Sequence, residues 1–286
     1  MATKPRIAIV GAGNFATALA LSLRRAGYRI AWVMARSTRT SFRKASVLAG
    51  EIGAVAVQKP QSARPVDLVW FCVPDSQIAV AAKSLAGTSP WKGVIALHSS
   101  GALASDELSL LRDQGAAVAS VHPLMTFVRG VRPSLANVPF AIEGDAKAVP
   151  AARAIVNDVS GIAYPIRKSD KAAYHAWGTF ASPLFTALLA ATEQVASVAG
   201  VKPPEARKRM IPILLQTLAN YAMMGAPAAF SGPIVRGDVE TVKKHLQVLR
   251  SRPGERDVYK ALARAALLYL PTKNASQLKT ILGKVG

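Results

Sequence analysis

The 286-residue sequence contains a single cysteine, and this shortage limits what the protein can be. Cys72 alone cannot form an intramolecular disulfide, and it excludes any metal site built from several cysteines. We therefore assign no metal-binding residues and expect a reducing, cytoplasmic location. The apolar run near the N-terminus is also too short for a secretory signal peptide, and it is typical of a first strand.

Acidic residues are also few, with 16 Asp and Glu against 36 Lys and Arg, so the formal net charge is +20 and the pI is near 10.6. Such a charge suits an anionic partner, such as nucleic acid or an anionic membrane surface. The basic residues are spread along the chain, however, and no helix-turn-helix, zinc-finger or RNA-binding motif accompanies them. We therefore expect an anionic small molecule as the partner, and no nucleic acid.

Two long stretches lack charged side chains altogether, at residues 172–192 and 210–235. Each is long enough to cross a bilayer. His175 and Pro183 interrupt the first, however, and prolines, a glycine and side-chain amides interrupt the second. Helices that are apolar on all faces are buried, either within protein or in a membrane. We expect a protein core and a homodimer interface here, and no membrane span.

The most informative motif that is present lies within Ile7–Ala20, IAIVGAGNFATALA. It has the form of an apolar strand, a G-x-G-x-x-A turn and a helix, which is typical of dinucleotide binding. Gly11 permits the tight turn, Gly13 lets backbone approach a pyrophosphate, and Ala16 allows close helix packing. The alternative is a glycine-rich turn without a ligand. The cofactor-binding residues predicted from this motif are Gly11, Gly13, Asn14, Phe15 and Ala16.

An acidic side chain is missing where an NAD-binding protein needs one. Such sites carry Asp or Glu about 20 residues past the glycines to accept from the ribose 2′-OH, but the first acidic residue here is Glu51. The second predicted strand ends instead in Arg36, Ser37 and, two residues later, Arg39. Guanidinium and hydroxyl groups suit a 2′-phosphate, so we predict NADP(H). The alternative is that these are solvated charges.

Residues 1–165 alternate short apolar strands with helical stretches, which predicts an α/β, doubly wound parallel sheet, the Rossmann fold. Ligands collect outside the carboxyl ends of such strands. Val73, Pro74, Ser99 and Ser100 fall at these ends, so we predict that they contact the cofactor. The expected strands are at residues 7–10, 29–34, 54–57, 68–73, 93–97, 117–120 and 140–143.

Residues 166–286 show helical patterns only, which predicts an all-helical substrate and dimerisation domain. Pro183 should kink a long helix at 169–199, because it removes one backbone hydrogen bond. Asp238 can cap the helix that follows it, and Asn274 a short terminal one. The other expected helices are at 204–223, 238–249 and 255–270.

Three side chains are candidates for chemistry. His122 directly follows a strand, and His175 lies near the start of the long helix. Hydride transfer to C=O or C=N needs a proton donor, and imidazole titrates near neutrality. Arg236 stands beside a helix N-terminus, an arrangement that suits an anion. The alternatives are structural histidines and an Arg236–Asp238 contact that only shapes the loop.

Several longer motifs resemble those of a known protein family: GAGNFATALA, HSSGA, HPLMTF, YHAWGTFAS and SGPIVRGD. The sequence resembles a bacterial family with a Rossmann-like domain followed by a helical domain of unknown function. The wider group includes pyrroline-5-carboxylate reductase, ketopantoate reductase and 6-phosphogluconate dehydrogenase. The resemblance implies an NADP-dependent oxidoreductase with a 6-phosphogluconate dehydrogenase-like C-terminal domain, dimeric through that domain, with a substrate cleft between domains.

The HPLMTF segment, which begins at His122, is also similar to the His-Pro-Met segment of prephenate dehydrogenases. One position departs from the wider group, because Pro183 stands where an Asn is expected on the long helix. We predict hydride transfer between NADP(H) and a small anionic carbonyl or imine. A non-catalytic NADP(H) sensor and a prephenate dehydrogenase-like enzyme remain as alternatives, and the substrate and the reaction direction stay open.

Overall fold

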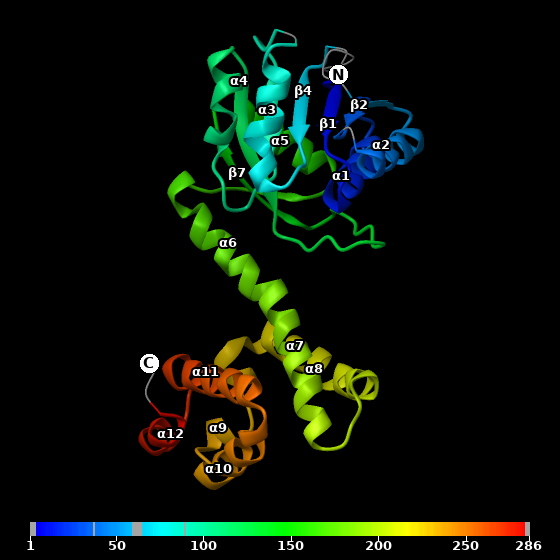
Figure 1. Ribbon diagram of the computed structural model, residues 1–286. Coiled ribbons are helices and arrows are strands. Elements are labelled where there is room, and N and C mark those ends of the chain that lie inside the picture. The colour runs from blue at the N-terminus through cyan, green and yellow to red at the C-terminus, as the bar shows by residue number, and fades with distance from the viewer. Residues whose placement is uncertain (1–3, 37, 59–64, 89, 284–286) are drawn as a thin grey trace. The chain divides into compact units, whose positions relative to one another are not determined.

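The computed structural model describes residues 4–36, 38–58, 65–88 and 90–283. The chain forms two compact units, Met1–Phe180 and Ala181–Gly286 (Figure 1). The domain boundary expected at residue 165 falls at the end of the last strand, and the first unit continues beyond it through one more helix.

The first unit is built on one eight-stranded sheet with the order β3-β2-β1-β4-β5-β6-β7-β8. All neighbouring strands pair in parallel except β6 and β7. Every residue of β1 and of β4 is buried, as expected for central strands covered on both faces. The strands are β1 Ile7–Val10, β2 Ile30–Met34, β3 Val55–Val57, β4 Leu68–Phe71, β5 Ile95–His98, β6 Ala117–Pro123, β7 Pro139–Gly144 and β8 Ile162–Pro165.

Two features of this sheet differ from the sequence-based expectation. β7 runs antiparallel to β6, because the connection over residues 124–138 contains no helix and so makes no crossover. β8 was not expected at all. None of its residues is buried, and Ile162 is 53% exposed, so the strand carries no strong hydrophobic signal.

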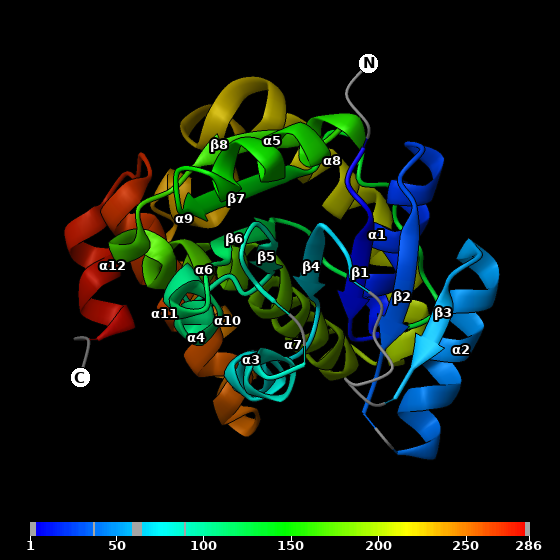
Figure 2. The same ribbon diagram turned by 90° about the horizontal axis from the view of Figure 1, so that it is seen from above.

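Helices cover both faces of the sheet, which confirms the doubly wound α/β fold. α1 (Asn14–Arg25), α2 (Arg39–Ile52) and α5 (Ala148–Asp158) share one buried apolar cluster with the strands. α3 (Ile78–Ala86) and α4 (Ser109–Asp113) contribute to a second cluster. Figure 2 shows α5 on one side of the sheet and α3 and α4 on the other.

The first unit ends with α6 (Lys171–Thr179), and a π-helical segment, η5 (Phe180–Leu184), follows directly. Pro183 lies inside η5. A proline has no N–H to donate to the carbonyl four residues earlier, and a π turn is one way for a helix to accommodate the loss. The helix expected at 169–199 is therefore interrupted at the proline that the sequence singles out.

The second unit is helical, as predicted. Its small core joins Val242 and Leu246 to Ala263, Leu278 and Leu282. Its helices are α7 Phe185–Val198, α8 Pro203–Ala229, α9 Pro233–Arg236, α10 Val239–Val248, α11 Pro253–Tyr269 and α12 Ala275–Leu282 (Figure 1).

The two predicted helix caps have different outcomes. Asp238 caps α10, because its Oδ1 accepts from the Thr241 N–H at 3.0 Å and its Oδ2 from the Thr241 hydroxyl at 2.7 Å. Asn274 precedes α12 but makes no side-chain cap. It adopts a left-handed conformation with φ 52°, and its amide donates to the Gly237 carbonyl at 3.1 Å. The predicted Asn274 cap is therefore wrong, because a tertiary contact uses that amide.

The uncharged helices are largely exposed within their unit. α7 has no buried residue, and α8 has only Ala206. Over the part of the chain that the structure describes, no single helix is both long and apolar enough to cross a membrane. One bent pair of segments, Lys168–Val198 and Pro203–Arg236, meets the requirement of length and composition jointly.

Candidate functional site

A cavity of about 660 Å³ lies in the first unit, at the carboxyl ends of β1, β2 and β4. Gly11, Gly13, Arg36, Val73 and Pro74, all predicted to contact a cofactor, line it. The volume is within the range of small-molecule sites. The complete lining is Val10, Gly11, Ala12, Gly13, Met34, Ala35, Arg36, Ser41, Lys44, Gln58, Cys72, Val73, Pro74, Gln77, Val80, Ala81 and Ser84.

The two glycines of the turn meet different requirements. Gly11 has φ 112°, and a Cβ there would overlap the Cys72 backbone carbonyl. Gly13 has extended backbone, and a Cβ there would meet no atom within 4 Å. Gly11 is thus needed for the fold, whereas Gly13 leaves open space at the start of α1. No side chain caps the first turn of α1, so its N–H groups are available to an anion.

Three further residues of the motif do not line this cavity. The Asn14 side-chain amide donates to the Phe127 carbonyl at 3.0 Å. The rings of Phe15 and Phe127 meet edge to face, with centroids 5.1 Å apart. Ala16 is buried in the core. Asn14 and Phe15 therefore hold the segment that follows β6 onto the start of α1.

The cationic end of the cavity combines Arg36 with Ser41 and Lys44 of α2. The sequence analysis missed Ser41 and Lys44. They lie in the helix that follows the arginine-rich loop, and that helix has no acidic residue in its first turn. Arg39 begins α2 but does not line the cavity, and Ser37 lies outside the described residues. Two cations and a hydroxyl together suit a phosphate.

A second group of side chains surrounds His122, which β6 carries near its end. Its Nδ1 is hydrogen-bonded to the Tyr174 hydroxyl at 2.9 Å. The His175 ring stands nearly perpendicular to the His122 ring, with centroids 6.2 Å apart. A Cβ on Gly101 would lie 2.8 Å from His122 Nε2 and 2.7 Å from His175 Cδ2. The structure thus brings the two predicted catalytic histidines together, with a glycine packed against both.

The environment of His122 disfavours the imidazolium form. Burial lowers its pKa to about 4, and the positive charge of Lys171 and the neighbouring His175 and His98 contribute in the same direction. The ring is therefore neutral at pH 7. The sequence-based expectation that it titrates near neutrality is wrong, because burial disfavours the charged form.

Lys171, the first residue of α6, was not among the residues predicted from the sequence. This side chain is only 1% exposed. Its ammonium donates to the Ser100 carbonyl at 2.9 Å and to Ser120 Oγ at 2.7 Å. Burial lowers its pKa to about 8, against the opposing effect of the Glu143 and Asp75 carboxylates. The sequence gives no signal for this burial, because Lys171 ends a polar run that is typical of an exposed helix start.

The two predicted serines of the turn after β5 have partners within the protein. Ser99 Oγ accepts from the Trp70 indole N–H at 2.8 Å. Ser100 Oγ donates to Asp75 at 2.8 Å and accepts from the backbone N–H groups of residues 102 and 103. Neither serine lines the 660 Å³ cavity. Their hydrogen bonds fix the turn that carries Gly101.

His98 and Glu143 form hydrogen bonds with other groups of the segment 99–105 that follows β5. His98 Nδ1 accepts from the Ser100 N–H at 3.1 Å, and Nε2 donates to the Ala104 carbonyl at 3.0 Å. Burial lowers the pKa of His98 to about 4, so this ring stays neutral. The Glu143 carboxylate accepts from the N–H and the hydroxyl of Ser105, at 2.6 and 2.8 Å.

The third predicted catalytic residue, Arg236, belongs to the second unit, where it ends α9 and is exposed. Gly237 follows it with φ 66°, and a Cβ there would overlap the Lys273 carbonyl. Hydrogen bonds from Thr241 lower the pKa of Asp238, and the charge of Arg236 adds to this effect. Gly237 and Asp238 of the SGPIVRGD motif are therefore accounted for by a close backbone contact and a helix cap.

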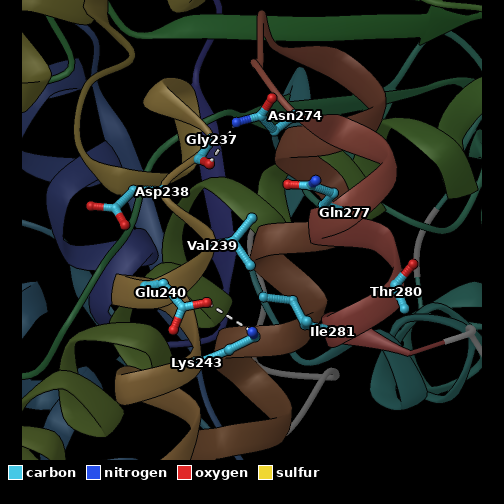
Figure 3. Close-up of a pocket in the computed structure, with 9 residues that line it drawn as sticks. All are labelled: Gly237, Asp238, Val239, Glu240, Lys243, Asn274, Gln277, Thr280 and Ile281. Carbon is cyan, nitrogen blue, oxygen red and sulfur yellow. Dashed lines mark hydrogen bonds and ion pairs between the residues drawn. The ribbon is translucent and has the colours of Figure 1, made fainter.

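A cavity of about 610 Å³ lies beside this motif, between α10 and α12 (Figure 3). Several of its polar side chains already have partners: Glu240 pairs with Lys243 at 2.8 Å, and Asn274 donates to the Gly237 carbonyl. Arg236 does not line it. The lining residues are Gly237, Asp238, Val239, Glu240, Lys243, Asn274, Gln277, Thr280 and Ile281.

Among the residues that the structure describes, no group of three or more His, Cys, Asp or Glu side chains is placed to hold a metal ion.

Two family models match the sequence. A Rossmann-like domain matches residues 2–123, and a domain of unknown function, DUF2520, matches residues 138–266. No curated protein matches the sequence.

Several solved structures share the fold. A Bacteroides fragilis protein for which an NADP oxidoreductase activity is proposed has a TM-score of 0.77 and 22% identity, over 92% of this chain and 97% of that one. A reductive aminase from Aspergillus terreus, in complex with NADPH and ethyl-5-oxohexanoate, has a TM-score of 0.65 and 18% identity, over 98% and 100% of the two chains. A pyrroline-5-carboxylate reductase from Coxiella burnetii has a TM-score of 0.57 and 16% identity, over 99% and 100%. The chain belongs to the proteins that join a Rossmann-like domain to the DUF2520 domain of unknown function.

Proposed function

We propose that this protein is an NADP(H)-dependent oxidoreductase that transfers hydride between the nicotinamide and the carbonyl or imine carbon of a small anionic molecule. The observation that carries the proposal is the cavity at the G-x-G-x-x-A turn, which has Arg36 and Lys44 where an NAD-binding site needs a carboxylate. The similar structure of the Aspergillus terreus reductive aminase, which holds NADPH, supports the same cofactor.

The residues of the cavity fit a dinucleotide phosphate. Gly13 leaves open space beside the uncapped first turn of α1, where a pyrophosphate can accept hydrogen bonds from backbone N–H groups. Arg36, Ser41 and Lys44 would hold the 2′-phosphate. The large excess of basic residues favours binding of this polyanion further.

NADPH, when bound, supplies the hydride. The protein then has to stabilise the negative charge that develops on the substrate heteroatom. In the tautomer in which the Tyr174 hydroxyl donates to Nδ1, the proton of the neutral His122 ring resides on Nε2. This N–H is a preorganised donor for a carbonyl oxygen or imine nitrogen. The neighbouring His175 is exposed, so solvent beside it can supply the proton that the substrate heteroatom takes up. Arg236 and the overall positive charge favour an anionic substrate.

We further infer a homodimer through the helical unit. α8 exposes several large apolar side chains, among them Ile213 at 67%, Leu215 at 62% and Tyr221 at 60% exposure. Residues 210–235 carry no charge, so two copies, each with a net charge of +20, approach there with the least repulsion. Analytical ultracentrifugation of the wild type and of Ile213→Glu tests this, and equal dimer contents in the two would contradict it. The cytoplasmic location stays a prediction.

The first experiment is a fluorescence titration of the purified protein with NADPH and NADH, in the wild type and in Arg36→Ala. We expect NADPH to bind more tightly, and the difference between the cofactors to shrink in the variant. The oxidation of NADPH is then followed with cyclic imines, keto acids and ketone plus amine mixtures. Failure of both nucleotides to bind would overturn the proposal, and tight binding without turnover would leave the non-catalytic sensor.

A further inference from the structure

The most unusual charge in the first unit is the buried ammonium of Lys171. Lysine is almost never fully buried unless it is paired, because removing its charge from water is costly. Within the described residues, no carboxylate lies within ion-pair distance of this ammonium. The two nearby acids have other partners, since Glu143 bonds Ser105 and Asp75 bonds Ser100. Burial of a charge without an ion-pair partner is typical of functional sites.

The hydrogen bonds of Lys171 join three elements of the first unit. The ammonium comes from α6, the Ser100 carbonyl belongs to the turn after β5, and Ser120 Oγ belongs to β6. Ser120 closes the arrangement by donating to the same Ser100 carbonyl at 3.2 Å. The next residue in the turn is Gly101, which packs against both histidine rings.

The same geometry places the ammonium beside His122. Residues two apart on a strand point to the same face, as Ser120 and His122 do on β6. Residues three and four apart on a helix also share a face, and Lys171, Tyr174 and His175 have this spacing on α6. One face of β6 and one face of α6 therefore bring the ammonium and the imidazole together.

We propose that Lys171 is a positioning residue for His122: its buried ammonium holds the Ser100–Gly101 turn against β6 and keeps a fixed positive charge beside the imidazole. The part of this inference that concerns turnover rests on the proposed function. The part that concerns the charge of His122 does not.

The groups that face His122 favour a neutral ring. Lys171 and His175 approach from α6 and His98 from β5, and all three lower the pKa of His122 in addition to burial. The Tyr174 hydroxyl on Nδ1 brings no charge. The two acids of the surroundings, Asp75 and Glu143, act on Lys171 and raise its pKa. The ammonium thus keeps the imidazole uncharged while it remains protonated itself, which its pKa of about 8 permits at neutral pH.

The test replaces Lys171 by Gln, which keeps a donor for Ser100 and Ser120 but removes the charge, and by Met, which removes both. The matched control is Lys168→Gln, since Lys168 lies three residues earlier and its exposed ammonium pairs with Asp106 instead. The pH titration of the His122 Cε1–H signal is followed by NMR in each full-length variant. We expect the pKa of His122 to rise by on the order of one unit in both Lys171 variants and to stay unchanged in the control.

The result that would overturn the proposal is a folded Lys171→Gln protein in which His122 titrates as in the wild type. A merely structural lysine would lower the melting temperature without moving this titration. Ser120→Ala is the second variant, since it removes one acceptor and no charge. We expect it to leave the titration of His122 in place and to lower kcat at an unchanged KM for NADPH. An unchanged kcat in this variant would exclude the holding role. If the protein oxidises no NADPH, the NMR titration still decides the electrostatic part.

Discussion

The Nδ1 atom of His122 lies 2.9 Å from the hydroxyl oxygen of Tyr174, and these residues come from a strand and a helix 52 positions apart in the sequence. The hydroxyl also approaches the carbonyl of His122 itself, at 3.5 Å. This contact occupies one imidazole nitrogen, and the other, Nε2, lies next to Gly101 and would meet the substrate in the proposed function.

Replacement of His122 by Ala is expected to lower kcat by at least about 100-fold, because the hydrogen-bond donor at the substrate heteroatom is lost. The affinity for NADPH should stay nearly unchanged, since His122 does not line the cofactor cavity. Steady-state kinetics and a fluorescence titration measure the two quantities. Turnover that survives in this variant would show that His122 has another role.

Tyr174→Phe removes only the hydroxyl that orients His122. We expect kcat to fall about tenfold, in line with the loss of one buried hydrogen bond, with little change in the affinity for NADPH. The second unit provides a matched control, because His245 Nδ1 and the Tyr259 hydroxyl form the same kind of contact at 3.0 Å. Tyr259→Phe should leave kcat intact. Equal losses of kcat in the two variants would indicate a general effect on stability.

Lys44→Ala should weaken NADPH binding about tenfold and leave NADH binding unchanged, because in the proposed site the lost cation would face only the additional phosphate. Arg39→Ala is the control, since Arg39 lies in the same helix and outside the cavity. Calorimetric titrations with both nucleotides distinguish these outcomes. If Arg39→Ala weakens NADPH binding more than Lys44→Ala does, the phosphate lies elsewhere.

The two glycines of the turn should respond differently to alanine. Gly13→Ala is expected to keep the melting temperature of the wild type, because its Cβ meets open space. It is expected to lose NADPH affinity, because the proposed pyrophosphate would occupy that space. Gly11→Ala should lower the free energy of unfolding by about 1 to 3 kcal/mol, owing to its positive φ and the overlap with Cys72. Full NADPH affinity in Gly13→Ala would contradict the placement of the cofactor.

The depressed pKa values of His98 and His122, each about 4 against an ordinary value of 6.5, make stability depend on pH. Between pH 6.5 and pH 4 the unfolded chain binds protons that the folded protein does not, so the free energy of unfolding falls as the pH is lowered through this window. The loss is up to about 3 kcal/mol for each ring. Urea unfolding at pH 7 and pH 5 measures it, and His122→Gln should show a smaller difference. A stability that is flat over this range would contradict the burial of both rings as neutral groups.

Much of the fold and part of the site follow from consecutive residues. The glycine turn and the arginine after the second strand are local patterns, as are the Asp238 cap and the interruption at Pro183, because the backbone requirement and the side chain that meets it lie within a few positions of each other. Local sequence patterns therefore grouped Arg36 and the two glycines, and the structure places all three along one cavity. The strand β8 could not be predicted in this way, since it is exposed and leaves no strong hydrophobic pattern. The pattern of β7 predicts a strand but not its direction, which depends on the connection from β6.

The sequence by itself determined the doubly wound sheet, the dinucleotide turn and the helical second unit. Only the tertiary structure decided which side chains surround His122. Lys171 and Ser120 are 51 residues apart, and Tyr174 and His122 are 52 apart, so no local pattern links them. Burial also changed the chemistry: in water the Lys171 ammonium and the His122 imidazole have ordinary pKa values, and the folded environment lowers both, because it removes solvent from the charged forms.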